Sequence, residues 1–182
     1  MSMPINEKDF FVNDFYKRTL SILHESHKDY EVTLILNLMV GLLVVPKEKY
    51  FDNKAIPDSF VSKELLDKVQ KCITKNFIDG KTNSDNSLKE IIRNLRNAVA
   101  HGGLEIFRKD SYLKSFDEKI ESIAFKNKGF FYSNKYKRRI NVEFEIALTY
   151  DLLKSFLIEF ATNICKQIEE RNDIRWKKLK AY

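Results

Sequence analysis

The stretch from Arg93 to His101 carries the residue types best suited to chemistry in this chain. At about 100° per residue around a helix, Arg93, Arg96, Asn97 and His101 share one face, opposite the apolar residues of the same stretch. Guanidinium groups donate paired N–H bonds to phosphate oxygens, and imidazole exchanges protons near neutral pH. This face therefore suits a phosphodiester, and we expect it to point away from the core, toward solvent or a partner subunit.

Such groups can cleave RNA without a metal ion. The ribose 2′-hydroxyl attacks the adjacent phosphorus, a base removes its proton, an acid protonates the departing 5′-oxygen, and a cation stabilises the charged intermediate. The same spacing also fits a structural role, in which His101 interacts with the last carbonyls of a helix and the arginines form a solvated face. The residues alone leave both interpretations open.

Residues 96–101 (Arg-Asn-Ala-Val-Ala-His) resemble the signature of the HEPN ribonucleases, which is an arginine, a polar residue, a few small or apolar residues and a histidine. The wider layout, from about Phe10 to Ile168, resembles the HEPN nucleases associated with plasmids and phage defence. HEPN domains are helical bundles that dimerise, so that the signature helices of two subunits form a shared cleft for RNA. The resemblance thus implies a homodimer with RNA as its partner.

The resemblance also implies a role for each residue of the signature. Arg96 would bind and stabilise the scissile phosphate, His101 would be the acid or base, and Asn97 would orient the phosphate or the imidazole. Arg93 is added from its helical position as an RNA-binding residue. We expect a metal-independent endoribonuclease with no cofactor, and the resemblance to defence systems implies a toxin held inactive by an antitoxin or regulatory protein. The alternative is a non-catalytic HEPN-type module that binds RNA or a protein partner.

Two basic clusters lie outside the signature. Lys137, Arg138 and Arg139 follow a tyrosine-containing segment, and cations beside aromatic rings are typical of surfaces that bind single-stranded nucleic acid. We predict that these three residues bind RNA, with solvated charge as the alternative. The second cluster, in residues 171–182, predicts a basic C-terminal tail.

Other candidate sites are weaker. His24 and His27 lie three residues apart, but no third histidine is available to complete a metal site with them. Residues 79–82 (Asp-Gly-Lys-Thr) imitate only the end of a phosphate-binding loop, without its first glycine or a preceding strand. We therefore predict no metal site and no nucleotide cofactor.

Composition favours one ordered domain over residues 1–182, because 43% of the residues are hydrophobic and only 5 are glycine. The net charge of +6 favours polyanions without selecting one. Two cysteines, Cys72 and Cys165, are too few for a disulfide scaffold and are expected in the core. No apolar run approaches the roughly 20 residues that span a membrane, and the first residues lack a secretory-signal pattern, so we expect a cytoplasmic protein without a membrane partner.

The elements that position these residues follow from hydrophobic periodicity. Three- and four-residue spacings predict helices over residues 10–26, 30–45, 58–77, 87–101 and 148–168. Two-residue alternation over 140–146 predicts a strand, paired with 121–126 in a β-hairpin insertion at 119–147 whose tip is 130–139. The predicted fold class is mainly α, a HEPN-like helical bundle of about five helices with a small β-hairpin before the last helix.

Overall fold

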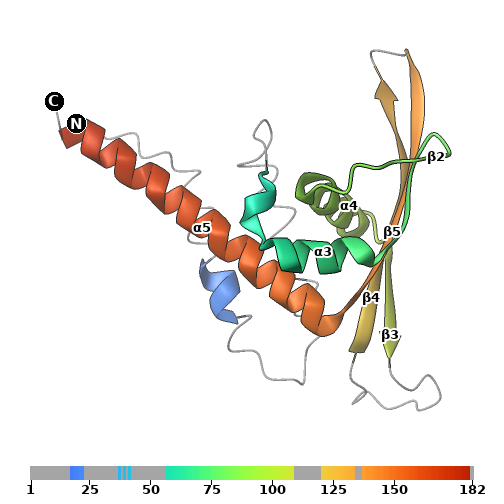
Figure 1. Cartoon of the computed structure of the whole chain (residues 1–182), viewed down its shortest axis with the longest axis horizontal. Coiled ribbons are helices and arrows are strands. Elements are labelled where there is room, and N and C mark those ends of the chain that lie inside the picture. The colour runs from blue at the N-terminus through green and yellow to red at the C-terminus, as the bar shows by residue number, and fades with distance from the viewer. Residues whose placement is uncertain are drawn as a thin grey trace.

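The computed structural model describes residues 17–22, 37, 39, 41, 56–108, 120–133 and 137–180 (Figure 1). Residues 17–22 are helical, and most of the predicted helices 10–26 and 30–45 lies outside the described residues. From residue 56 on, the elements in chain order are the 3-10 helix η4 (Asp58–Phe60), α3 (Lys63–Lys71), β1 (Ile73–Ile78), β2 (Lys81–Thr82), α4 (Leu88–Ala100), β3 (Leu104–Arg108), β4 (Ile120–Ser133), β5 (Arg138–Thr149) and α5 (Tyr150–Lys180).

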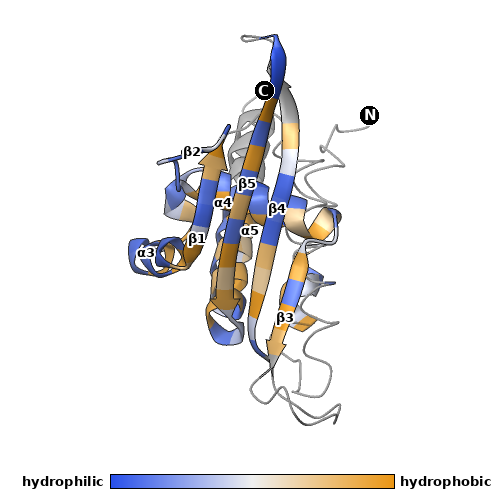
Figure 2. Cartoon of the chain, turned by 90° about the vertical axis from the view of Figure 1, so that its right-hand side faces the viewer, coloured by the Kyte–Doolittle hydropathy of each residue, from blue (hydrophilic) through white to orange (hydrophobic). Residues whose placement is uncertain are grey.

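The strands form one antiparallel sheet in the order β2-β1-β5-β4-β3. β4 and β5 pair without a register shift from Ser122 opposite Thr149 to Ser133 opposite Arg138, in the region where the sequence predicts a hairpin. Helices α3, α4 and α5 lie on one side of this sheet (Figure 1), and Figure 2 looks onto the sheet with these helices behind it. The side chains of each strand therefore alternate between a face toward the helices and a face away from them.

The prediction of a mainly α bundle is wrong, because the described residues contain a five-stranded antiparallel sheet against which the helices pack. The error is clearest in the predicted helix 58–77, which stops at Lys71 and continues as β1 along β5. Its apolar residues fit a helical spacing, but the partner strand lies far away in the sequence and is invisible to local periodicity. The buried Asn76 stabilises the extended path, since its Nδ2 donates to Asp85 O at 3.1 Å and to Asn86 Oδ1 at 2.7 Å.

α5 is longer than the predicted helix 148–168. It spans 31 residues and includes most of the segment assigned to a basic tail. Among the described residues, no helix, α5 included, combines the length and the apolar character that crossing a membrane requires.

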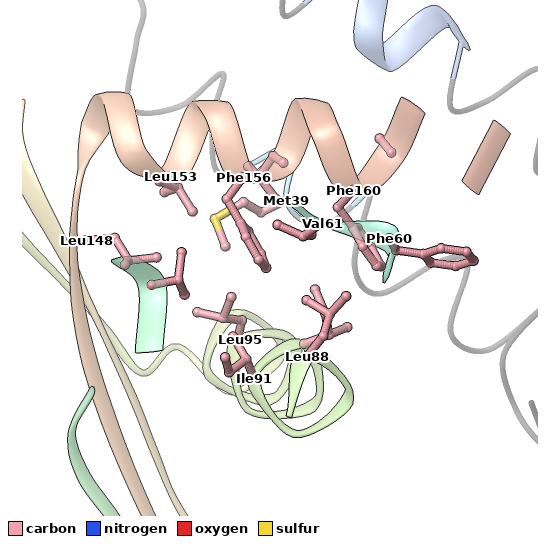
Figure 3. Packing of buried hydrophobic residues seen from close by; sticks show 14 of the residues in the cluster. Met39, Phe60, Val61, Leu88, Ile91, Leu95, Leu148, Leu153, Phe156 and Phe160 are labelled. Atoms are coloured by element: carbon pink, nitrogen blue, oxygen red, sulfur yellow. The ribbon is translucent and has the colours of Figure 1, made fainter. Parts of the chain in front are cut away.

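The core fills the space between the sheet, α4 and α5 (Figure 3). α4 contributes Leu88, Ile91 and Leu95, and α5 contributes Leu153, Phe156 and Phe160. From β5, every second residue from Phe144 to Leu148 is buried, as the two-residue alternation predicts. Because the apolar side of α4 is fixed in this core, the opposite side of the helix is held in one orientation.

Candidate functional site

The start of α4 is fixed by two oxygen acceptors. Ser87 is the N-cap, and its Oγ accepts from the Glu90 N–H at 3.4 Å, as the Ser-x-x-Glu pattern predicts. Asp58 Oδ1, from η4, accepts from the Leu88 N–H at 2.8 Å. The Glu90 carboxylate, which in a capping box would accept from the Ser87 N–H, forms an ion pair with the Arg93 guanidinium. The first turn of α4 is therefore tied to η4 as well as to its own cap.

The end of α4 lies directly against β4. His101 is the C-cap, Gly102 has φ +72°, and the Gly103 N–H donates to Ala98 O at 2.8 Å, which is the long bond of a Schellman motif. The Gly103 carbonyl in turn accepts from the Lys126 N–H at 2.7 Å. A Cβ at Gly103 would lie 1.9 Å from Lys126 O, so only glycine fits this approach.

Two hydrogen-bonded asparagine side chains make a second connection between α4 and β4. Asn94 is 1% exposed, and its Nδ2 donates to Glu90 O at 2.9 Å. Asn127 Nδ2, from β4, donates to Asn94 Oδ1 at 2.8 Å. Buried polar groups are costly unless they are hydrogen-bonded, and both ends of the Asn94 amide are satisfied here.

These connections leave a pocket of about 430 Å³ between α4 and the β4–β5 pair. Three predicted site residues, Arg93, Asn97 and His101, line it from the helix. The strands contribute Asn127, Lys128, Gly129, Phe130 and Val142. The structure thus brings an imidazole, a guanidinium and two amides to one concave surface.

Arg96 does not line this pocket. It is half-buried, and its Nη1 donates to Asn97 Oδ1 at 2.9 Å, so it acts on the pocket through Asn97. Arg93, inside the pocket, pairs with Glu90, whose side chain is only 12% exposed. Burial raises the pKa of the Glu90 carboxyl, and the charge of Arg93 opposes that rise.

The division of α4 into an apolar and a polar side is confirmed, but the surroundings of the polar side differ from the prediction. The apolar stripe is buried, with Leu88, Ile92 and Leu95 at 2% exposure or less. On the polar side, predicted to face solvent or a partner subunit, Arg93, Asn97 and His101 also border the β4–β5 pair across the pocket, and the His101 side chain is exposed. The reason is the sheet itself, which the sequence analysis did not predict at this place.

The basic turn, which we define as Lys137, Arg138 and Arg139, lies outside the pocket lining. All three side chains are exposed. Arg138 Nη2 is 2.5 Å from Asp79 Oδ2, and the Arg139 guanidinium lies 4.4 Å from the centroid of the Phe130 ring. The hydrogen bond from the Asn141 N–H lowers the pKa of the Asp79 carboxyl most, and the Arg138 guanidinium lowers it further. None of the three residues therefore lines the pocket, and Arg139 lies over Phe130, which does.

The sequence analysis missed the strand residues of the pocket, above all Asn127 and Gly129. Ile123 and Phe125, at the preceding positions on the same face of β4, are completely buried. A polar residue and a glycine then interrupt this apolar series. That interruption in an alternating strand is the signal that could have identified a polar wall.

The other reactive side chains do not form a second site in the described part of the chain. Burial raises the pKa of the Cys165 thiol to about 11, and Cys72 Sγ donates to Lys68 O at 3.3 Å. Within the described ranges, no three His, Cys, Asp or Glu side chains are grouped as metal ligands would be. His24 and His27 lie outside the described residues.

Comparison with known proteins identifies the family. No curated protein and no solved structure matches the chain. The family model described as HEPN pEK499 p136 matches residues 1–171, a range that includes α4 and every residue of the pocket. The resemblance seen in residues 96–101 is confirmed at the level of the family, and the chain belongs to the HEPN pEK499 p136 family.

Proposed function

We propose that this protein is a metal-independent endoribonuclease that cuts RNA beside the C-terminal half of α4. The observation that carries the proposal is the pocket lined by His101, Asn97 and Arg93. Cleavage by the 2′-hydroxyl uses an imidazole that exchanges protons near neutrality and a guanidinium that binds phosphate, and both are present in this pocket. The family and its Arg-polar-x-x-x-His signature support the same assignment.

The reaction forms a bond from the ribose 2′-oxygen to phosphorus and breaks the bond from phosphorus to the 5′-oxygen. His101 exchanges the proton, either as the base for the 2′-hydroxyl or as the acid for the 5′-oxygen. Arg93 stabilises the negative charge that develops on the phosphoryl oxygens, Asn97 orients the phosphate, and Arg96 holds the Asn97 amide through its bond to Oδ1. The products are a 2′,3′-cyclic phosphate and a 5′-hydroxyl.

A homodimer completes this scheme. The pocket holds one imidazole, whereas the reaction needs both a base and an acid. Two copies of α4 that meet near the exposed His101 would supply both groups to one cleft. A protein that remains strictly monomeric at high micromolar concentration would contradict this part of the proposal.

The test is incubation of the purified protein with single-stranded and structured RNAs, with and without excess EDTA. We expect cleavage that persists in EDTA and leaves a cyclic phosphate. His101→Ala should lower the cleavage rate by at least about a hundredfold, because it removes the proton-exchanging group. Arg96→Ala should also lower the rate, because Asn97 loses the guanidinium that holds its amide. Lys89→Ala is the matched control, since Lys89 is an exposed residue of α4 outside the pocket.

Cleavage that survives His101→Ala, or that strictly needs Mg²⁺, would refute the assignment. If the protein binds RNA but cuts none, it is a non-catalytic HEPN-type binding module. A toxin restrained by an antitoxin is the biological form of the proposal, and it predicts that expression of the wild-type chain alone arrests growth while His101→Ala does not.

A further inference from the structure

The two amides that line the pocket have fixed and opposite orientations. The Glu90 carbonyl can only accept, so Asn94 must present its Nδ2 to it and its Oδ1 to Asn127. Asn127 must then donate with its own Nδ2. This network leaves Asn127 Oδ1, an acceptor, as the remaining amide atom of that side chain.

Asn97 is fixed by the same logic from the other side. A guanidinium has only donors, so the atom of Asn97 that meets Arg96 Nη1 is the acceptor Oδ1. The remaining amide atom is Nδ2, a donor. One wall of the pocket thus carries an amide donor and the other an amide acceptor, and within the described residues no further hydrogen bond occupies either atom.

The space between the amides depends on Gly129. A Cβ built at this position would meet no atom within 4 Å, so the backbone of β4 there borders open space. Val142 of β5 adds an apolar surface beside it. The pocket volume of about 430 Å³ lies in the range of small-ligand sites. A flat polar group with apolar faces fits these features.

We infer that this pocket is a subsite for one unpaired nucleobase of an RNA strand, whose edge binds to Asn97 Nδ2 and Asn127 Oδ1. Every nucleobase carries neighbouring acceptors and donors on its Watson–Crick edge, and that edge is accessible only when the base is unpaired. The inference rests on the proposed function for its ligand and adds the substrate class to it: single strands and loops, not continuous duplex. Arg93 and His101, at the same pocket, then meet the phosphate next to the bound base.

The experiment measures binding separately from cleavage. Fluorescence anisotropy with the His101→Ala protein compares short RNAs that differ at one unpaired position, either one of the four bases or an abasic ribose, with free nucleoside monophosphates and a duplex as further arms. We expect the RNA that carries at least one of the four bases to bind about tenfold tighter than the abasic RNA. The duplex and the free nucleotides should bind more weakly than this preferred RNA. The base-to-abasic ratio cancels any change in general phosphate attraction.

Four variants test the three features. Asn97→Asp exchanges the donor for an acceptor and should change the order of preferred bases, whereas a charge effect alone would weaken all strands equally. Asn127→Ala should reduce the base-to-abasic ratio toward one. Gly129→Val should remove the preference by filling the pocket, and Gly129→Ala should do so partially. Ala147→Val is the matched control, because Ala147 is an exposed strand residue of β5 outside the pocket.

The outcomes separate the two proposals. Equal binding of abasic and base-containing strands, or a preference that survives the Asn97 and Asn127 changes in folded variants, overturns the base subsite even if the wild-type protein cuts RNA. A base preference without any wild-type cleavage supports the subsite and refutes the endoribonuclease. Tighter binding of a free nucleotide than of the strand overturns RNA as the ligand.

Discussion

Replacing Gly103 by alanine tests how the end of α4 is held against β4, and with it the geometry of the pocket. The added Cβ would lie 1.9 Å from the backbone oxygen of Lys126, a separation that real Cβ atoms essentially never show. Because the obstructing atom belongs to the backbone of a paired strand, it cannot rotate away. One of the two segments must move by about 1 Å, which is a large displacement in a close-packed structure.

The expected cost has two parts. Movement strains the bonds from the Gly103 N–H to Ala98 O and from the Lys126 N–H to Gly103 O, each worth about 1 kcal/mol. Overpacking adds about 1–3 kcal/mol, so we expect Gly103→Ala to lower the free energy of unfolding by about 3–5 kcal/mol. Gly102→Ala is the control, because its added Cβ meets nothing within 4 Å and its positive φ costs only about 1–2 kcal/mol.

Chemical denaturation of the two variants beside the wild-type protein measures the difference. For a chain of this size, 1 kcal/mol corresponds to about 2–4 °C in Tm, so a thermal scan should separate the variants clearly. RNA cleavage below the Tm of Gly103→Ala should also decrease, because Asn127 and His101 lie next to the displaced junction. If Gly103→Ala destabilises no more than Gly102→Ala, the close approach of α4 to β4 is wrong.

Three further predictions concern other parts of the chain. Asp58→Ala should lower the free energy of unfolding by about 1 kcal/mol in a urea titration, because the Leu88 N–H loses its acceptor, and Asp58→Asn, which keeps an oxygen, should lower it less. Neutralising the basic turn should weaken RNA binding and flatten its dependence on salt, since fewer counterions are released, and an unchanged slope would refute its role. Cys165 should react with a thiol reagent at pH 8 only after unfolding, because its side chain is buried and its pKa is raised to about 11.

The helix that carries the signature could be predicted from the sequence because its limits are set locally. Ser87 and Glu90 mark its first turn, and two glycines follow its C-cap, His101. Capping depends on residues three or four apart, so no knowledge of the rest of the fold is needed. The signature that carries the family resemblance lies in this same local stretch, which is why it too could be recognised.

The sheet could not be predicted in full because strands depend on distant partners. β1 has apolar residues that fit a helix, and its pairing with the distant β5 favours the extended form. β2 has two residues and no periodicity of its own. The strand at 140–146 was found because its two-residue alternation is clear, yet its actual pairing with β4 continues as far as Ser133 and Arg138, through the segment assigned to the tip.

The transition from core to pocket is set by a few residues on facing elements. Along β4, the positions toward the helices change from Ile123 and Phe125, both buried, to Asn127 and Gly129. On α4, the buried Asn94 meets Asn127 at this same change. The hydrogen bond between the Asn94 and Asn127 side chains separates the apolar core from the pocket. The lack of a side chain at Gly129 keeps the pocket open. The sequence shows only that one face of α4 is polar. That face becomes one wall of a site because the β4–β5 pair supplies the other wall.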